Sequence, residues 1–570
     1  MRGFRRSVAS FDAVGQFAIL GIFSGLVTGL VILAFRTLIE IPLDIFLEGD
    51  FENFEGLSQH YYFLLPAAGA VCLAIFMTLL KPEYRRVGSV HVLERLARFQ
   101  GHLPWQNAMV QFFAGIIALA SGQSGGREGP AIHLGAAGSS LLGQYLTLPN
   151  NSIRVLVGCG AAAAISASFN TPMAGVIFSM EVIIMEYTIA GFVPVILAAV
   201  TATLINQLVY GAETAFSVPL TVANYSFYDL PFLLIEGILI GAVAALFVRL
   251  VTLIHSHAPA AISARMLIAG ATTGLLALLV PQVLGVGYDT VTLALDGNLA
   301  LLVLLAACTF KILATATTVA LGVPVGVIGP TIFIGAMAGG IIGTLVNLLM
   351  PETAASPGFY VMLGMGAMMG AVLQAPLAAL MAVMELTNNS HIILPAMLVI
   401  IVANLTSSQV FKVRSIFITQ MQMLGLEFRQ NPLSMALNRA SVASIMSRSF
   451  LRVAQVITLE RARELSKAKP VWLLVDTSKG AAFILRTEDL SLYLAGLDKD
   501  TDKANVDLKE IPATRKDVRS IMLQATLSEA LDSLNQTGVQ ALYVTRISAP
   551  MIDSAVGIIN RSDIESYYQS

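Results

Sequence analysis

Long apolar segments without charge occupy most of the chain, from about residue 14 to residue 410. No Asp, Glu, Lys or Arg occurs between Arg154 and Glu181, between Lys311 and Glu352, or between Glu352 and Glu385. Each stretch approaches or exceeds the roughly 20 residues that a helix needs to cross ~30 Å of hydrocarbon. The pattern therefore predicts many membrane-crossing helices in this part of the chain.

Glycine and proline interrupt nearly all of these apolar segments. The breaks fall at residues 125–130, 171–172, 322–330 and 374–376. Broken helices are tolerated at membrane depth only where they line a cavity or are buried in protein. We therefore expect some of these helices to start or end inside the membrane.

The interrupted segments recur, which indicates an internal duplication. Gly126-Arg127-Glu128-Gly129-Pro130 returns 200 positions later as Gly326-Val327-Ile328-Gly329-Pro330. Pro172, Met180 and Glu181 return at an offset of 204 as Pro376, Met384 and Glu385. The carboxylate of Glu128 has no counterpart, because Ile328 stands at the matching position.

Paired, interrupted segments in two halves are typical of transporters built from repeats. The N-termini of their half-helices meet near the midplane and present positive dipole ends. A glycine-rich turn keeps the backbone N–H groups there open to a halide or an oxyanion. The sequence therefore predicts a small anion as the ligand.

Composition supports a multispanning membrane protein and excludes little else. Hydrophobic residues make up 56% of the chain, charged residues 12%, and the mean hydropathy is +0.75. A net charge of −2 gives no argument for nucleic acid. Cys72, Cys159 and Cys308 lie far apart, so we predict neither a disulfide framework nor a metal site. Arginines at positions 2, 5 and 6 favour a cytoplasmic N-terminus.

The last part of the chain has ordinary amphipathic sequence and a second, weaker duplication. Each unit is expected to contain a short helix (459–468 or 527–534), a buried strand, a turn, a second strand and a closing helix. The polar segment 498–510 between the units is expected to be a mobile linker. We expect a cytoplasmic segment at 1–13, a membrane domain at 14–420 with repeats at about 14–210 and 230–420, linkers at 421–440 and 497–514, and small domains at 441–496 and 515–570.

The paired units resemble tandem CBS domains, which in that family dock on each other and sometimes bind adenine nucleotides. The resemblance makes Asp489 and Asp563 the candidates for holding a ribose. Nucleotide-binding members usually have a hydroxyl residue three positions earlier, but Arg486 and Asn560 stand there. A dimerising regulatory tail is the alternative, and the protein is expected to require no cofactor.

The two matched turns, the two matched Pro-to-Glu segments and the single unmatched acid resemble the CLC family of chloride channels and chloride/proton exchangers. The resemblance implies inverted repeats, a homodimer with one pore per subunit, and a glutamate gate at Glu128 that blocks the anion path when ionised. A carboxylate and a chloride compete for the same positive pocket. The residues expected to bind the anion are Ser89, Gly126, Arg127, Gly129, Gly326, Val327, Ile328 and Phe417.

Departures from the family pattern bear on mechanism. Ser89 lies in Val-Gly-Ser-Val-His, which lacks the proline of the family's first glycine-rich motif, and Phe417 replaces its anion-coordinating tyrosine. Val182 occupies the place of the internal glutamate that passes protons in coupled members, as is common in channels. Glu181 and Glu186, which lies about one helical turn beyond Val182, remain candidates for another proton path.

Other conspicuous residues have structural interpretations. Gly158, Gly160, Gly364 and Gly366 are expected to permit close packing of membrane helices. His91, His133 and His391 have no partner cluster in the sequence, which favours core or interface roles.

The sequence thus favours a voltage-gated or proton-gated chloride channel, with chloride/proton exchange as the alternative. A membrane-anchored CBS sensor is a remote alternative. An enzyme is not indicated, because the apolar region contains no acid and base pair at helical spacing. We expect a homodimer in the lipid bilayer, in a bacterial inner membrane, that handles chloride and protons, with both termini cytoplasmic.

Overall fold

The computed structural model describes residues 14–47, 54–212, 216, 225–350, 355–426, 432–477, 480–497, 504–549 and 552–569. The chain divides into two compact units. The larger unit comprises Phe17–Leu146 and Ile153–Phe428, and the smaller unit is made mainly of Arg429–Ser570. The expected N-terminal segment 1–13 lies outside the described residues, as do Glu352, part of the linker 421–440 and residues 498–503 of the second linker.

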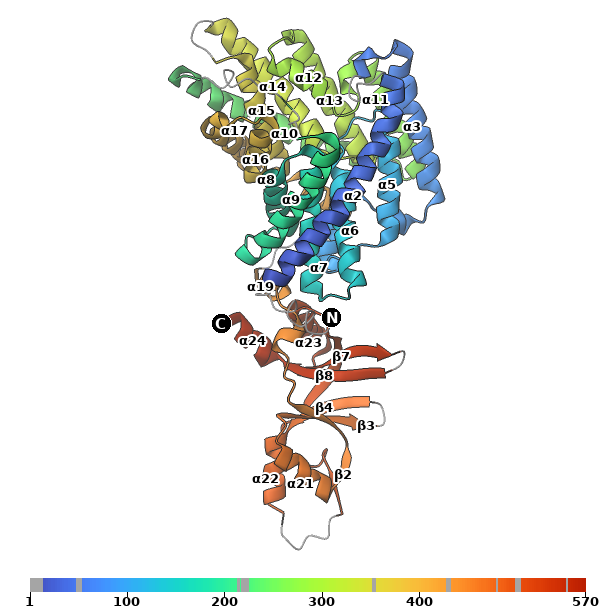
Figure 1. Ribbon diagram of the computed structural model, residues 1–570, viewed down its shortest axis with the longest axis vertical. Helices are drawn as coiled ribbons and strands as arrows, with labels where there is room; N and C mark the ends of the chain where they lie inside the picture. Colours follow the sequence, from blue (N-terminus) through green and yellow to red (C-terminus); the bar gives the residue numbers. More distant parts are fainter. Residues whose placement is uncertain are drawn as a thin grey trace. The chain divides into compact units, whose positions relative to one another are not determined.

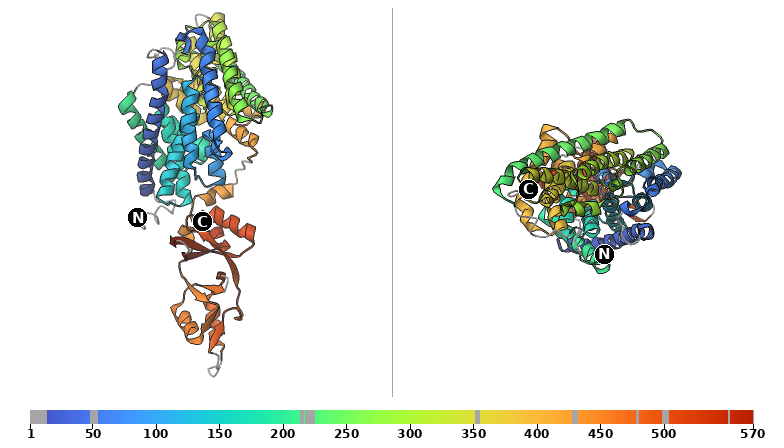
Figure 2. Two further views of the ribbon diagram at one scale, coloured as in Figure 1. Left: turned by 90° about the vertical axis from the view of Figure 1, so that its right-hand side faces the viewer. Right: turned by 90° about the horizontal axis from the view of Figure 1, so that it is seen from above.

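The larger unit consists of helices packed side by side (Figure 1, Figure 2). Eight helical stretches among the described residues are long and apolar enough to cross a membrane, and shorter apolar helices lie between them. This mixture of full and interrupted helices confirms the predicted fold class. The main helices are α2 (Val14–Leu47), α3 (Gln59–Leu79), α4 (Gly88–Arg98), α5 (Trp105–Ala120), α6 (Glu128–Tyr145), α7 (Asn150–Phe169), α8 (Pro172–Phe178), α9 (Ile189–Tyr210), α10 (Leu230–Ser256), α11 (Ile262–Ala277), α12 (Tyr288–Leu295), α13 (Leu301–Leu321), α14 (Ile328–Leu349), α15 (Pro357–Leu373), α16 (Pro376–Thr387), α17 (Ile393–Leu405) and α18 (Ile416–Met423).

The helix starts fall where the sequence predicts them. Helix α6 begins at Glu128 and α14 begins at Ile328, so the two glycine-rich turns lead directly into matching helices. Helices α8 and α16 begin at Pro172 and Pro376. Proline suits the first position of a helix, because the N–H that it lacks has no partner within the helix there.

Glycines hold the helices of each repeat close together. A Cβ added at Gly160 of α7 would lie 2.1 Å from the carbonyl oxygen of Gly135 in α6, and one at Gly364 of α15 would lie 2.3 Å from that of Gly335 in α14. Side chains at these positions would force the backbones apart. The close-packing interpretation of Gly160 and Gly364 is confirmed.

Glu181 and Glu385 join the two repeats by a reciprocal contact. The carboxylate of Glu385, in α16, accepts hydrogen bonds from the backbone N–H groups of Met173 and Ala174 at 2.9 and 2.7 Å. The carboxylate of Glu181 accepts them from Leu377 and Ala378 at 3.3 and 2.7 Å. Each glutamate thus binds the unpaired N–H groups at the start of the other repeat's helix, α8 or α16.

Glu385→Gln is expected to destabilise the protein by about 1 to 2 kcal/mol, because a neutral amide is a weaker acceptor at a helix N-terminus. Glu181→Gln should have a similar effect. Thermal unfolding in detergent measures both, with Asp296→Asn, an exposed change at the end of α12, as the control. Equal unfolding temperatures in all variants would show that the reciprocal contact contributes nothing to stability.

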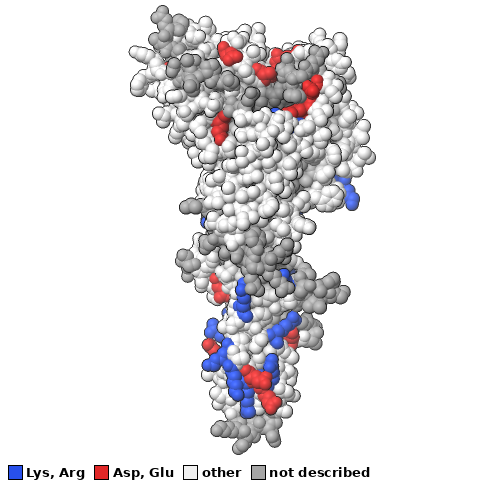
Figure 3. Space-filling view, viewed as in Figure 1, with Lys and Arg blue, Asp and Glu red and all other residues white. Residues whose placement is uncertain are grey.

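Charged side chains are sparse on the visible surface of the larger unit and frequent on the smaller one (Figure 3). Within the larger unit, several charged residues are instead buried. Lys311, fully buried in α13, donates to the carbonyl oxygens of Val283 and Gly285 at 3.1 and 2.9 Å. A buried charge is tolerated when it is hydrogen-bonded in this way.

The smaller unit has a six-stranded sheet in the order β1-β3-β4-β6-β7-β8 and a two-stranded sheet of β2 and β5. In both halves of the large sheet, a parallel pair (β1 with β3, β6 with β7) is followed by an antiparallel pair (β3 with β4, β7 with β8). The predicted order of helix, strand, strand and helix occurs in both copies. The elements are α19 (Pro432–Asn438), α20 (Val442–Ile445), β1 (Phe450–Ala454), β2 (Val456–Thr458), α21 (Leu459–Ala468), β3 (Trp472–Thr477), β4 (Gly480–Arg486), α22 (Thr487–Ala495), β5 (Asn505–Asp507), β6 (Lys516–Met522), α23 (Leu527–Thr537), β7 (Ala541–Ala549), β8 (Ile552–Asn560) and α24 (Arg561–Gln569).

The two copies join through β4 and β6 and through an apolar cluster that includes Trp472, Ile484 and Ile558. This duplicated α/β fold agrees with the resemblance to tandem CBS domains. The expectation of a mobile linker at 498–510 is wrong for its second part, because β5 (Asn505–Asp507) pairs with β2. Val506 is buried in the core of the first copy, which the polar composition of the segment conceals.

Candidate anion site

The two glycine-rich turns meet each other at the centre of the larger unit's site. The N–H of Gly126 donates to the carbonyl oxygen of Gly326 at 2.8 Å, and the N–H of Gly326 donates to that of Gly126 at 2.6 Å. A Cβ on Gly129 would lie 2.8 Å from the Cα of Gly326. The starts of α6 and α14 are therefore in direct backbone contact, which only glycine permits.

Glu128 is fully buried at this contact. Its carboxylate lies against three of the glycines, because a Cβ on Gly126, Gly326 or Gly329 would come within 3 Å of its oxygens. The carboxylate thus occupies the space beside the start of α14, near N–H groups whose dipoles favour a negative charge. This is the placement that a carboxylate competing with an anion requires.

A cavity of about 260 Å³ adjoins this contact. It brings together most of the residues predicted to bind the anion, although they come from both repeats. Those that line it are Ser89, Gly129, Gly326, Val327, Ile328 and Phe417.

Gly126 and Arg127 are not among the residues that line the cavity. Gly126 is used in the backbone contact with Gly326. The guanidinium of Arg127 lies 5.6 Å from the centre of the Phe169 ring. Contact of these two residues with the anion stays a prediction.

Basic side chains that the sequence analysis did not single out also line the cavity. They are Arg85, Arg86, Arg265 and His255. Arg86 forms an ion pair with the buried Glu94, and Arg85 donates to the carbonyl oxygen of Leu80 at 2.7 Å. Such a basic wall raises the local concentration of anions. The charged run at residues 81–86 was the available signal.

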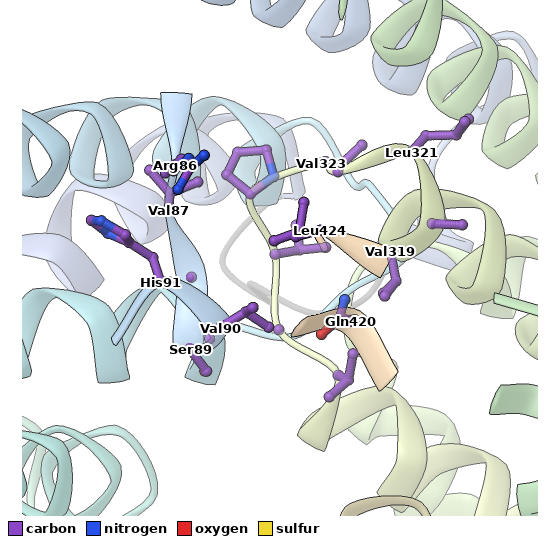
Figure 4. A pocket seen from close by; sticks show the side chains of 18 of the residues that line it. Arg86, Val87, Ser89, Val90, His91, Val319, Leu321, Val323, Gln420 and Leu424 are labelled. Atoms are coloured by element: carbon purple, nitrogen blue, oxygen red, sulfur yellow. The ribbon is translucent and has the colours of Figure 1, made fainter. Parts of the chain in front are cut away.

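Gln111 of α5 fixes the turn that precedes Ser89. Its Oε1 accepts a hydrogen bond from the N–H of Gly88 at 2.7 Å, and its Nε2 donates to the carbonyl oxygen of Pro324 at 3.3 Å. Gly88 has a φ of +80°, which glycine adopts without strain. Gln111 therefore links the turns of the two repeats on the cavity wall, where Figure 4 shows Ser89 and Val90 on one side and Gln420 on the other.

Phe417 contributes an aromatic ring and no hydroxyl to the cavity. It is 4% exposed and packs edge to face against Phe178, with ring centres 6.4 Å apart. The cavity therefore lacks the donor that a tyrosine would supply at this position.

Phe417→Tyr is expected to tighten chloride binding by about 10-fold, since a hydrogen bond to a charged group contributes about 1.5 to 3 kcal/mol. Isothermal titration of the purified protein with chloride measures the change. Phe417→Leu, which also alters the ring but adds no donor, is the control. An affinity that rises equally in both variants would mean that packing and not the hydroxyl is responsible.

The candidates for a proton path are separated by the local backbone. Glu181 and Val182 lie in η3, a π-helical segment (Ser179–Ile184), and Met185 then adopts a left-handed φ of 58°. The expectation that Glu186 follows Val182 by one helical turn is wrong, because the helix ends before it. Glu181 binds the start of α16, and the proton role of both acids stays a prediction.

His91 and His133 contradict the expectation that they have no partner. The Nδ1 of His91 lies 2.9 Å from the Nε2 of His133, and the rings stack with centres 5.1 Å apart. The contact joins α4 to α6 across 42 positions of sequence. No local pattern signals it, because it depends on how the two helices pack.

The smaller unit gives no independent support for nucleotide. Asp563 accepts a hydrogen bond from the N–H of Asn560 at 2.8 Å, which closes the turn before α24. Asp489 lies in the first turn of α22. Nucleotide binding at these residues stays a prediction. Within the described ranges, no group of three or more His, Cys, Asp or Glu residues is placed to hold a metal ion.

A family model described as voltage gated chloride channel matches residues 68–408, which is more than half of the chain. The match includes both glycine-rich turns and both Pro-to-Glu segments. The chain belongs to the CLC family. The predicted family is thereby confirmed. Members of the CLC family are ion transporters rather than enzymes.

Two bacterial proteins are among the CLC relatives that resemble this chain. A putative chloride channel protein ClcB-like of Ralstonia nicotianae is 31% identical over 356 residues, which cover 60% of this chain and 82% of that protein. An H(+)/Cl(-) exchange transporter ClcA of Vibrio cholerae is 31% identical over 307 residues, which cover 51% of this chain and 64% of that protein.

Solved CLC structures share the fold at lower sequence identity. A slow cyanobacterial Cl-/H+ antiporter has a TM-score of 0.63 at 21% identity and covers 72% of this chain and 98% of its own. A eukaryotic CLC transporter has a TM-score of 0.59 at 19% identity and covers 98% of both chains. The second match thus extends over the smaller unit as well as the larger one.

Proposed function

We propose that this CLC protein exchanges chloride for protons across a membrane. The sequence analysis favoured a passive channel because of Val182 and Phe417. The comparisons favour the alternative, since the Vibrio cholerae relative is named as an exchange transporter and the cyanobacterial structural neighbour is described as an antiporter. The smaller unit then acts as a tail of a transporter and not as the sensor of an anchored receptor.

The buried carboxylate of Glu128 beside the start of α14 carries the proposal. When ionised, it occupies the positive end of the helices and keeps an anion out. When protonated, it loses its charge and its advantage over chloride, so an anion from the cavity can take its place. A single group that must gain a proton before chloride passes couples the two movements.

The cavity supplies the anion to that group. Arg85, Arg86 and Arg265 attract chloride to the wall formed by Ser89 and the starts of α6 and α14. The N–H groups of Val327 and Ile328 are the donors that we assign to the bound anion, because the first N–H groups of a helix have no partners within it. No residue requires a cofactor for this step.

Proteoliposomes containing the purified protein test the exchange. A chloride gradient is applied while external pH is recorded and no other proton pathway is present. Uphill proton movement driven by chloride is the expected result. Chloride flux without proton movement would overturn the exchange and make the protein a channel.

Several further parts of the proposal follow from the family and from the helices. The apolar larger unit lies in a lipid bilayer, and we assign it to a bacterial inner membrane. We also propose that the protein is a homodimer with one pathway per subunit. Both termini of each subunit lie on the cytoplasmic side of the membrane. Cross-linking in membranes and protease access from each side test them.

A further inference from the structure

Two buried histidines of the larger unit form a pair that the exchange described above does not use. His91 in α4 and His133 in α6 share a hydrogen bond of 2.9 Å between Nδ1 and Nε2. Their exposed fractions are 5% and 0%. Because each neutral imidazole has one donor and one acceptor nitrogen, the pair can pass a proton from ring to ring.

The two ends of the pair face different surroundings. His91 belongs to the wall of the anion cavity, and Figure 4 shows its side chain directed away from Gln420 and Leu424 on the opposite wall. The Nδ1 of His133 is buried and has no hydrogen-bond partner among the described residues. His133 lies in the same helix as Glu128, five residues later, which is about 7.5 Å along the helix axis. The pair therefore extends from the cavity wall into the helix that carries Glu128.

Charged groups around the pair oppose a lasting charge on it. Arg86 and Arg95 act electrostatically on His91, and Glu94 is paired with Arg86. Glu181, on η3 beside α4, is engaged with the start of α16. Helices α5, α14 and α18, which also pack against α4 or α6, contain no Asp, Glu, Lys or Arg. Helix α7 packs on α6 and carries Arg154, which donates to the carbonyl oxygen of Leu96 in α4, and α2, which also contacts α6, carries the ion pair of Arg36 and Glu40. The positive charges of Arg86 and Arg95 therefore disfavour a lasting positive charge on His91.

A purely structural role explains the pair less well. Polar side chains buried between helices cost free energy unless all their groups are bonded, and the free nitrogen of His133 is not. An unpartnered ionisable group at membrane depth is a sign of function. Apolar residues of similar size would fill the same space between α4 and α6 without that cost.

We propose that His91 and His133 carry protons between the anion cavity and the neighbourhood of Glu128, in place of the carboxylate that Val182 replaces. The inference rests on the proposed exchange of chloride for protons. A proton from the cavity binds the Nε2 of His91, whose Nδ1 proton then passes to the Nε2 of His133. The Nδ1 proton of His133 leaves toward Glu128. Rotation of both rings restores the starting tautomers, and no net charge stays on the pair.

The test compares chloride and proton fluxes in proteoliposomes for His91→Gln and His133→Gln. Glutamine keeps a hydrogen-bonding side chain but cannot carry a proton. His257→Gln is the matched control, because His257 is exposed after α10 and its side chain bonds with Ser256 and Leu253 of its own segment. We expect the number of protons moved per chloride to fall at least about 10-fold in both pair variants, with the control at the wild-type ratio.

Each of the other possible outcomes would overturn the inference about the histidine pair. If wild-type protein couples protons and both pair variants couple them at the wild-type ratio, the inference is wrong and the exchange stands. If wild-type protein moves no protons, the exchange and the inference fall together. His91→Asn and His133→Asn provide second variants, and if none of the four passes chloride, the pair is structural and the inference is overturned.

Discussion

Replacing Glu128 with glutamine is expected to abolish proton movement and to make chloride flux independent of pH. The glutamine amide cannot ionise, so it neither competes with chloride as an anion nor carries a proton. Proton flux should fall at least about 100-fold, which is within the range for loss of a positioned proton-transfer group. Chloride flux measured between acidic and alkaline pH in proteoliposomes checks both parts of the prediction.

Glu236→Gln is the matched control for this result, because Glu236 in α10 is also a fully buried carboxyl of the larger unit. It lies near Gly339 and away from the contact between the glycine-rich turns. Its replacement should leave coupling intact. If Glu128→Gln keeps the pH dependence of the wild type, or if Glu236→Gln loses it equally, Glu128 is not the specific gate.

Apart from replacement of Glu128 itself, Gly326→Ala is the change that we expect to reduce transport most strongly. The new Cβ would lie 2.4 Å from the backbone nitrogen of Gly129 and 2.9 Å from a carboxylate oxygen of Glu128. The turns must separate to accept it, and a displacement of about 1 Å at a working site can cost roughly 100-fold in rate. We expect chloride and proton flux to fall together, as measured in the same vesicle assay.

Gly138→Ala is the control for the glycine variant. Gly138 lies in α6, and an added Cβ would meet only a Val27 side-chain atom at 3.4 Å. Removing a helical glycine there should leave transport unchanged and add a few tenths of a kcal/mol to about 1 kcal/mol of stability. Normal transport by Gly326→Ala would show that the backbone contact between the turns is not needed for the anion path.

The sequence predicted the broken helices and their starts because the signals are local. Gly and Pro at residues 125–130 and at Pro376 act on the backbone where they stand, and the repeat doubles each signal. The candidate anion residues were found largely through the family resemblance, and the cavity brings together Ser89, Val327 and Phe417 from distant parts of the chain.

What the sequence did not predict depends on contacts between helices. Gln111 joins two turns separated by more than 200 residues, and the histidine pair joins two helices through residues that lie 42 positions apart in the sequence. The strand at Asn505–Asp507 was missed because one buried valine in a polar segment carries little signal. In each of these three cases, the role of a residue is determined by the distant residue that it contacts and not by its own local sequence.

The reciprocal contact of Glu181 and Glu385 has a consequence for the origin of this architecture. Neither half of the duplicated chain can complete its own short helix, since each relies on an acid that the other half supplies. A half-length ancestor could have met the same need only by pairing with a second copy of itself around a two-fold axis, with each copy's glutamate binding its partner. Fusion of the two genes would then have turned an intermolecular contact into a contact within one polypeptide. After fusion, the two glycine-rich turns could diverge, so that only the first now carries an acid, Glu128.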